Sequence, residues 1–344
     1  MSTRSRPAIV GLGALLIAAI ATGPALSTPA PEVKVIPAAH SRMERVDAMT
    51  EIHVLDAGPR SGRRATLVFI PGWRFTASIW SRQIEAFASG RRVIAIDPRS
   101  QGESTKTSNG DTPEQRARDL HVVLQRLAVG RRVLVGWSQG VQDVAAYIQQ
   151  FGTANLDGVV LVDSTISAGA PGVAASSDFA VQQLSLLSLF SASPRRYTEG
   201  MIQAVITRPL SPAARNALVD EALKTPTAIG EAMLVADLFT VDRRPALAKI
   251  DRPLLVIASP RSSELAQQRA MAARVPHAQF EVVSGAGHAV FVDQPEKFTA
   301  LLTNFLGRLP AARVLPTAHP GHANGRSFSR RNGLSSGGSS TAAH

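Results

Sequence analysis

Short apolar runs alternate with helical patterns along most of this 344-residue chain, and this alternation constrains the fold more than any other feature. Runs such as TLVFI (66–70) and GVVLV (158–162) are apolar throughout, which is typical of strands buried on both faces of a parallel sheet. Helical periodicity follows many of them, as in residues 112–128, which open with Thr112 at the N-cap position and Pro113 after it. We therefore predict an α/β protein with a doubly wound, mostly parallel sheet. The predicted strands cover residues 50–55, 66–70, 92–96, 132–135, 158–162, 253–258 and 279–283.

One segment, residues 168–245, breaks this alternation because it holds several proline-punctuated helical patterns and no clear strand. We predict that it forms a helical cap, inserted before the penultimate strand. Such an insertion lies over the carboxyl edge of the sheet, where open α/β sheets bind their ligands. The sheet and its flanking helices then come from residues 45–167 and 246–309.

The two ends of the chain carry different signals. Residues 1–27 combine two arginines with a 14-residue apolar run (8–21) and a small-residue stretch, the pattern of a secretory signal peptide. The apolar run is shorter than the roughly 20 residues that span a bilayer, although an uncleaved anchor is the alternative. We expect a periplasmic or secreted protein without stable membrane insertion after cleavage. Residues 310–344, rich in Gly, Ser, Ala and Arg, predict a disordered tail.

Composition excludes some classes of protein. The chain has no cysteine, so neither disulfides nor thiolate metal sites stabilise it. The net charge is +11, but several arginines lie in the two terminal segments, and basic runs interleaved with aromatics are lacking. Nucleic-acid binding is therefore not expected.

The stretch Gly136-Trp137-Ser138-Gln139-Gly140 matches the pattern G-x-S-x-G and lies between a predicted strand and a predicted helix. A nucleophilic serine in such a strand–turn–helix sits at strained backbone angles, and residues two positions away must be small. Both are glycine here. The sequence therefore predicts that Ser138 is a nucleophile, with a plain glycine-rich connector as the alternative.

Several motifs around Ser138 agree in order with the α/β-hydrolase superfamily, and the chain resembles a capped, serine-esterase-like branch of it over residues 45–309. FIPGWRFTASIW (69–80) resembles the oxyanion loop, with Pro71 in place of the usual His. AIDPRSQGEST (95–105) resembles the D-x-R-G-x-G-x-S turn, with Ser100 where Gly is common. GAGHAVFVDQPEKF (285–298) resembles the terminal GH-x-x-x-x-E-x-P motif, with Asp293 in place of Glu.

The resemblance implies an oxyanion hole formed by the backbone N–H groups of Trp73 and Gln139. His288 is the candidate base, because it lies in a glycine-bounded loop after the last predicted strand and follows Ser138 in the order typical of this superfamily. His53 and His121, by contrast, lie in strand and helix patterns where we expect no partner for them.

The third member of a catalytic triad is open at this point. In most relatives the acid follows the strand corresponding to PLLVIA, but Ser262 stands there and the next carboxylate is Glu264. Some members place it at the end of the strand before the cap, where this chain has Asp163. We favour Asp163, then Glu264, then a Ser138–His288 dyad assisted by Ser262 or a carbonyl. We expect Asp97 to fix the turn of residues 97–104 instead.

These residues predict an exported serine hydrolase that cleaves a carboxylic ester through an acyl-enzyme on Ser138. Neither a cofactor nor a metal is needed, and the expected partner is a small molecule with an apolar acyl group. Two alternatives stay open: a C–C bond or lactone hydrolase, and a non-catalytic ligand-binding protein of the same fold that has lost its acid.

Overall fold

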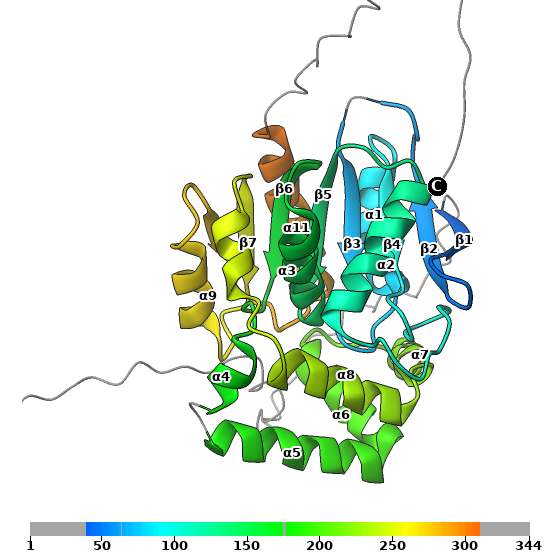
Figure 1. Cartoon of the computed structure of the whole chain (residues 1–344), viewed down its shortest axis with the longest axis vertical. Helices are drawn as coiled ribbons and strands as arrows, with labels where there is room; N and C mark the ends of the chain where they lie inside the picture. The colour runs from blue at the N-terminus through cyan, green and yellow to red at the C-terminus, as the bar shows by residue number, and fades with distance from the viewer. Residues whose placement is uncertain (1–38, 63, 175–176, 310–344) are drawn as a thin grey trace, which may run out of the picture. The chain divides into compact units, whose positions relative to one another are not determined.

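The computed structural model describes residues 39–62, 64–174 and 177–309, so the predicted signal peptide and tail lie outside the described residues. Eight strands form one sheet in the order β1-β2-β4-β3-β5-β6-β7-β8 (Figure 1). The β1–β2 and β2–β4 pairs are antiparallel and every other pair is parallel, which confirms the predicted sheet. The strands are β1 (Ala39–Arg45), β2 (Glu51–Ala57), β3 (Thr66–Ile70), β4 (Val93–Ile96), β5 (Arg132–Trp137), β6 (Leu156–Val162), β7 (Leu254–Ala258) and β8 (Gln279–Val282).

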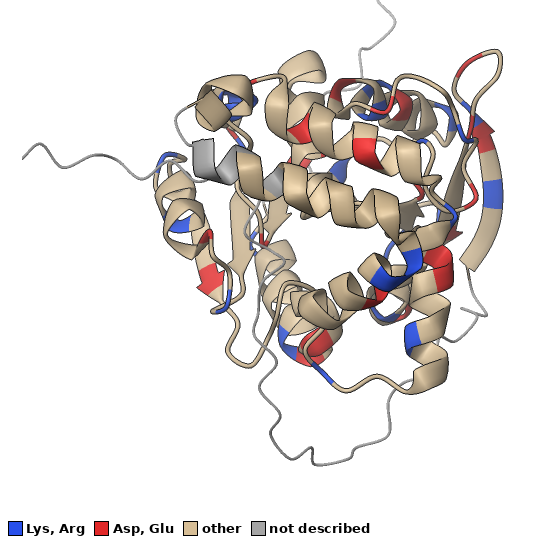
Figure 2. Ribbon diagram, turned by 90° about the horizontal axis from the view of Figure 1, so that it is seen from below, with Lys and Arg blue, Asp and Glu red and all other residues tan. Residues whose placement is uncertain are grey.

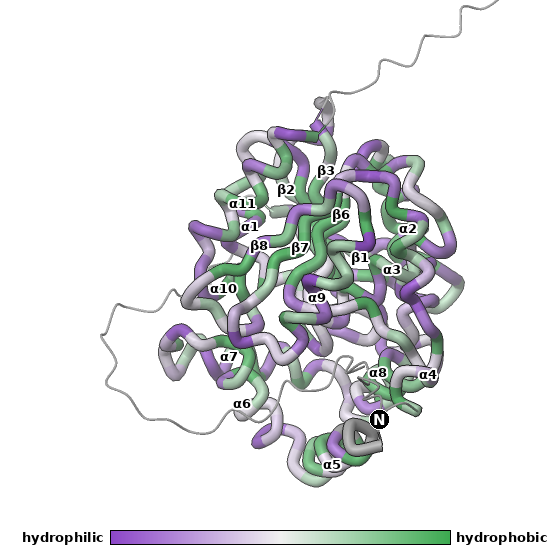
Figure 3. Tube along the Cα trace, turned by 90° about the vertical axis from the view of Figure 1, so that its left-hand side faces the viewer, coloured by the Kyte–Doolittle hydropathy of each residue, from purple (hydrophilic) through white to green (hydrophobic). Residues whose placement is uncertain are grey.

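Both faces of the sheet are buried, as the continuous apolar runs predict. In β3, Leu67 and Phe69 point into one apolar cluster, while Val68 and Ile70 point into the other. Helices α1 and α11 complete the first cluster, and α2, α3 and α9 complete the second. The central strands accordingly form the apolar interior in Figure 3. The helices are α1 (Ser81–Ala88), α2 (Pro113–Arg126), α3 (Gln139–Phe151), α9 (Leu265–Ala272) and α11 (Pro295–Gly307).

Helix α2 begins as its sequence predicts. The Thr112 hydroxyl accepts a hydrogen bond from the backbone N–H of Gln115, and Pro113 occupies the first turn, where it lacks only an N–H that would have no helical partner.

The described residues of the segment between β6 and β7 form helices and no strand, as expected of a cap. These helices lie beside the carboxyl ends of the strands (Figure 1). In agreement with this, Trp73, after β3, and Gln139, after β5, donate hydrogen bonds to α8. Figure 2 shows the cap helices from below the view of Figure 1. Helix α5 exposes Val181, Leu184 and Leu189 to solvent. The cap helices are α4 (Gly169–Ala174), α5 (Ser177–Ala192), α6 (Pro194–Val205), α7 (Pro212–Leu223) and α8 (Thr227–Phe239). None of the helices in the described ranges is long and apolar enough to cross a membrane.

Candidate active site

Ser138 lies in the predicted tight turn between β5 and α3, with φ 55° and ψ −119°. An L-residue held in such a conformation costs about 1–3 kcal/mol, which the surrounding structure must offset. A Cβ on Gly136 would lie 2.4 Å from the carbonyl oxygen of Gly140, and a Cβ on Gly140 would lie 2.5 Å from that of Ile70. Both flanking positions therefore require glycine. The turn leaves Ser138 partly exposed at the start of α3, where the helix dipole favours negative charge.

Asp163 and His288, far apart in sequence, meet at the same edge of the sheet. Asp163 follows β6, and its Oδ2 lies 2.9 Å from Nδ1 of His288. Its Oδ1 accepts a hydrogen bond from the backbone N–H of Ser259 at 2.7 Å, which fixes the carboxylate. If Nδ1 of the neutral imidazole donates to Asp163, the lone pair is on Nε2, the tautomer that a general base needs.

Trp137 connects the serine turn to the histidine loop. Its indole N–H donates to the carbonyl oxygen of His288 at 2.9 Å, and the two rings are 5.3 Å apart between centroids. The residue directly before Ser138 therefore holds the backbone of His288. Ser138 itself donates its N–H to Val162, the last residue of β6, next to Asp163.

Glu264, the second candidate for the acid, and Ser262, which would assist a Ser138–His288 dyad, have other partners. Oε2 of Glu264 accepts hydrogen bonds from the backbone N–H and the hydroxyl of Thr165, at 3.0 and 3.1 Å. The hydroxyl of Ser262 accepts from Gln268 at 2.8 Å. Glu264 thus supports the loop that follows Asp163, while Asp163 itself bonds to the histidine.

Asp293, which replaces the Glu of the terminal motif, ties the histidine loop to the cap. Its Oδ2 accepts hydrogen bonds from the N–H of Gly287 at 2.6 Å and from the hydroxyl of Thr207 at 2.7 Å. A second link joins the N–H of Ala289 to the carbonyl of Val205 at the end of α6. The loop that carries His288 is therefore held from both sides.

The predicted oxyanion loop lies against the serine. A Cβ on Gly72 would lie 3.0 Å from Cβ of Ser138, so the backbone of residues 72–73 approaches the candidate nucleophile closely. Trp73 is buried, and its indole N–H donates to the carbonyl of Gly230 in α8 at 2.9 Å.

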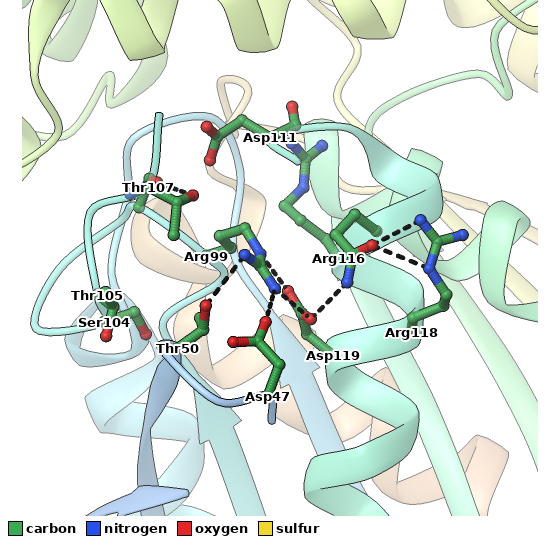
Figure 4. A network of polar contacts seen from close by, with 12 residues as sticks. Asp47, Thr50, Arg99, Ser104, Thr105, Thr107, Asp111, Arg116, Arg118 and Asp119 are labelled. Carbon is green, nitrogen blue, oxygen red and sulfur yellow. Dashed lines mark hydrogen bonds and ion pairs between the residues drawn. The ribbon is translucent and has the colours of Figure 1, made fainter. Parts of the chain in front are cut away.

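The predicted oxyanion loop is held by the buried side chain of Gln101 and by a charged network around Arg99. Gln101 accepts from the N–H of Arg74 at 2.9 Å and donates to the carbonyl of Phe75 at 2.8 Å. The turn that carries Gln101 is anchored by Arg99, which forms two bonds to Asp119 at 2.7 and 2.8 Å (Figure 4). Asp119 is the main reason that the pKa of Arg99 is raised.

Arg74 stands next to Trp73 and is fully buried. Its guanidinium lies 4.2 Å from the ring centre of Phe190, donates to the Thr198 hydroxyl at 2.5 Å and donates through Nε to the Ala222 carbonyl at 3.3 Å. Burial lowers the pKa of Arg74 to about 10. This side chain therefore extends from the core into α5, α6 and α7 and anchors the cap beside the oxyanion loop.

A second buried network joins Gln139 to the cap. Asp237 of α8 is fully buried and accepts hydrogen bonds from Nε2 of Gln139 and, at 3.1 Å, from Arg116. Arg116 also donates to Asp143 at 2.9 Å. Burial raises the pKa of Asp143 to about 7, with a further contribution from the neighbouring carboxylate of Asp237, and burial also raises the pKa of Asp237.

The expectation that His53 and His121 lack partners is wrong. Nδ1 of His53 lies 2.7 Å from Oδ2 of Asp97, and its Nε2 lies 2.9 Å from the hydroxyl of Ser41. His121 stacks on Phe151, with 3.9 Å between ring centroids. Each histidine meets a residue that is distant in sequence or one helix away, which a pattern along a single strand or helix does not reveal.

Asp97 does fix its turn, as expected. Its carboxylate accepts from the N–H of Glu103 at 2.8 Å, and Ser100, at the position where Gly is common, adopts a positive φ of 63°. Within the described residues, no group of three or more His, Cys, Asp or Glu is arranged to hold a metal ion.

Sequence reasoning did not identify Asp237, Arg74 or Gln101. Asp237 is the one acid in the apolar stretch MLVADLF, and a lone charge inside such a stretch is the only signal that pointed to it. Arg74 stands beside Trp73 of the predicted oxyanion loop without any pattern of its own.

A parallel-rich sheet, a strained serine turn after β5 and a histidine bonded to an aspartate at the same edge are the features of a capped α/β hydrolase. The chain belongs to the alpha/beta hydrolase family, whose model matches residues 67–301.

Individual relatives and structures agree with this assignment. A non-heme chloroperoxidase of Kitasatospora aureofaciens is 27% identical over 266 residues, covering 72% of this chain and 94% of that protein. The structure of an esterase from Rhodococcus sp. ECU1013 is 25% identical with a TM-score of 0.67, covering 78% of this chain and 99% of the other. A bromoperoxidase structure from Bacillus anthracis has a TM-score of 0.70 at 22% identity, over 78% of this chain and 100% of that one, and shows the shared fold.

Proposed function

We propose that this protein is an exported serine hydrolase that cleaves carboxylic esters of small molecules with an apolar acyl group. The observation that carries the proposal is the 2.9 Å contact between Nδ1 of His288 and Oδ2 of Asp163, at the edge of the sheet where Ser138 occupies a strained turn. This contact supplies an acid although Ser262 occupies the usual position after β7, and it therefore favours an enzyme over a binding protein with a lost triad.

In the proposed reaction, these residues take the following roles. Oγ of Ser138 attacks the acyl carbon while Nε2 of His288 takes its proton, and Asp163 stabilises the resulting imidazolium. The N–H groups of Trp73 and Gln139 stabilise the oxyanion of the tetrahedral intermediate. His288 then gives the proton to the leaving alcohol, and an acyl-enzyme remains. Water, deprotonated by His288, releases the acid and restores Ser138.

Burial within the cap supports an apolar acyl group. Phe190, Met201 and Met233 of the cap belong to the same buried apolar cluster as Trp73 and Trp137. Side chains from the cap and from the two predicted site loops thus pack together, and an apolar acyl group is the substrate part that such surroundings favour.

The test is labelling of purified protein with a fluorophosphonate, which modifies activated serines, beside hydrolysis of a p-nitrophenyl ester series. We expect the wild type to be labelled and Ser138→Ala to be unlabelled, with esters hydrolysed by the wild type alone. A folded wild type that neither reacts with the probe nor cleaves any ester contradicts the proposal. Retention of the N-terminus in protein recovered from the exported fraction of the producing cell would contradict cleavage near Ser27.

A further inference from the structure

Helix α8 bonds to both residues that we assign to the oxyanion hole. The indole of Trp73 donates to the carbonyl of Gly230 at 2.9 Å, and Nε2 of Gln139 donates to the carboxylate of Asp237. Both side chains are buried, so both bonds form away from solvent. The two donors come from different loops, after β3 and after β5, but they end on one helix.

Gly230 and Asp237 lie on the same face of α8. They are seven residues apart, which in an α-helix corresponds to about two turns and roughly 10 Å along the axis. One rigid helix can therefore fix the separation of the two loops. Catalysis benefits from donors that are fixed before the reaction, because they need no reorganisation when charge develops.

Tight packing and buried charge hold α8 in place at both contacts. A Cβ on Gly230 would lie 3.1 Å from Phe190 and 3.2 Å from Arg74, so the helix approaches the core as closely as glycine allows. At the other contact, Asp237 is fully buried and also bonds to Arg116. Moving Asp237 out of this position would separate a buried carboxylate from both Gln139 and Arg116, which is costly in free energy.

We propose that Asp237 is a positioning residue, and that α8 sets the geometry of the oxyanion hole by binding the side chains of Trp73 and Gln139. The inference rests on the proposed function, because it assigns a task to the cap in the same reaction. It implies that the cap, beyond shaping a pocket, determines how strongly the transition state is bound.

The test removes each bond but leaves the backbone N–H groups in place. Gln139→Met keeps the length of the side chain and removes its donor, and Trp73→Phe removes the indole N–H. The matched control is Glu103→Gln, which removes the charge of the Glu103–Lys224 ion pair between the core and the segment after α7, at 2.5 Å, without touching either donor or α8.

The readout is the affinity for a boronic acid, which mimics the tetrahedral intermediate, together with kcat and KM for a p-nitrophenyl ester. Loss of a whole donor typically costs about 10²–10³ in rate, so a displaced donor is expected to cost about 10-fold or more in kcat and in boronate affinity. We expect KM to change little for Gln139→Met and Trp73→Phe, and kcat and boronate affinity to stay near wild type for Glu103→Gln.

Two outcomes would overturn the inference. One is a kcat and boronate affinity in both variants no lower than in Glu103→Gln; the other is a raised KM at unchanged kcat, which indicates a pocket effect alone. If one variant fails to fold, the other decides. Fluorophosphonate labelling of the wild type keeps the two proposals apart, because an unlabelled wild type overturns the proposed function itself, whereas a labelled wild type with unaffected variants overturns only the task of α8.

Discussion

Two histidines of the described residues each contact an aspartate, and we propose chemistry at only one of these two pairs. In the hairpin of β1 and β2, Ser41 bonds to His53 at 2.9 Å, and His53 to Asp97 at 2.7 Å. At the carboxyl edge of the sheet, His288 bonds to Asp163 at 2.9 Å, a contact of the same kind.

The two aspartates are held in the same way. Asp97 accepts a hydrogen bond from the backbone N–H of Ala77, and Asp163 accepts one from the backbone N–H of Ser259. The difference lies in the serines. Ser41 is an exposed residue of an edge strand, paired across the hairpin with Leu55. Ser138 occupies a strained turn at the start of a helix, with the backbone of Gly72 packed against its Cβ.

The comparison teaches that a chain of hydrogen bonds from serine to aspartate does not by itself make a nucleophile. The hairpin arrangement joins β1, β2 and the turn after β4, and its task is structural. What we propose for Ser138 depends on its surroundings, above all on backbone N–H groups that can stabilise an oxyanion.

The largest expected effect separates the two serines. Ser138→Ala should lower kcat for ester hydrolysis by about 10⁶, the loss seen when the nucleophile of a triad is removed. Ser41→Ala should leave kcat within about twofold, because Ser41 does not lie at the site. Both are read from initial rates and from fluorophosphonate labelling. Labelling that persists in Ser138→Ala and disappears in Ser41→Ala would reverse the assignment of the two arrangements.

The next effect concerns the acids. Asp163→Asn should lower kcat by about 10⁴, since an asparagine favours the wrong tautomer of the histidine. Glu264→Gln is the matched control, and its rate should stay within about tenfold of wild type, because Glu264 bonds to Thr165. Steady-state kinetics at neutral pH measure both. A larger loss in Glu264→Gln than in Asp163→Asn would place the acid after β7.

A smaller effect is expected on stability from the hairpin histidine. His53→Gln should lower the free energy of unfolding by about 1–3 kcal/mol, the usual cost of leaving a buried polar partner unsatisfied. The kcat per folded molecule should change little. Chemical denaturation followed by tryptophan fluorescence measures the first, and titration of active sites normalises the second. A loss of activity far beyond the loss of folded protein would show that the hairpin takes part in the reaction.

The smallest expected effect concerns Asp143, a buried residue of helix α3, which begins directly after Ser138. Burial raises the pKa of Asp143 to about 7 from 3.8, so the folded protein binds a proton more tightly than the unfolded chain does. The contribution to stability is therefore complete below about pH 4 and is lost as the pH rises to about 7.

Asp143→Asn should remove this pH dependence. We expect the difference in melting temperature between pH 4 and pH 7 to change by about 2–4 °C, the shift that 1 kcal/mol gives in a domain of roughly 150–250 residues. Thermal unfolding of the wild type and the variant in matched buffers measures it. An unchanged difference would show that Asp143 stays ionised beside Arg116 throughout.

The sequence predicted much of this architecture because its signals are local. Seven strands were recognisable as short runs, six of them from their apolar composition, and the turn at Ser138 from two glycines two positions away. Asp163 is the favoured acid by resemblance, because Ser262 stands at the usual position and some members of the superfamily place the acid at the end of the strand before the cap. β1 was not predicted, because its sequence AHSRMER is polar and largely exposed, so that neither apolar periodicity nor a continuous run marks it.

The remaining features depend on contacts across the fold. His53 meets Asp97 44 residues away, and Asp237 meets Arg116 121 residues away. Neither pair has a spacing that a helix or strand imposes. The apolar neighbours of Asp237 in the sequence even favour a different interpretation, in which this stretch is an ordinary apolar helix face that packs within the cap.

The contacts of Asp293 limit how the cap can be exchanged between relatives. One carboxylate bonds to the loop of His288 and to Thr207, which lies just after α6. A chimaera that receives a foreign cap would therefore also inherit a new support for its histidine. We therefore expect that exchanging the cap helices alone does not suffice. The short segment after α6 has to be exchanged together with a compatible residue at position 293, so that the backbone of His288, the proposed base, keeps its position.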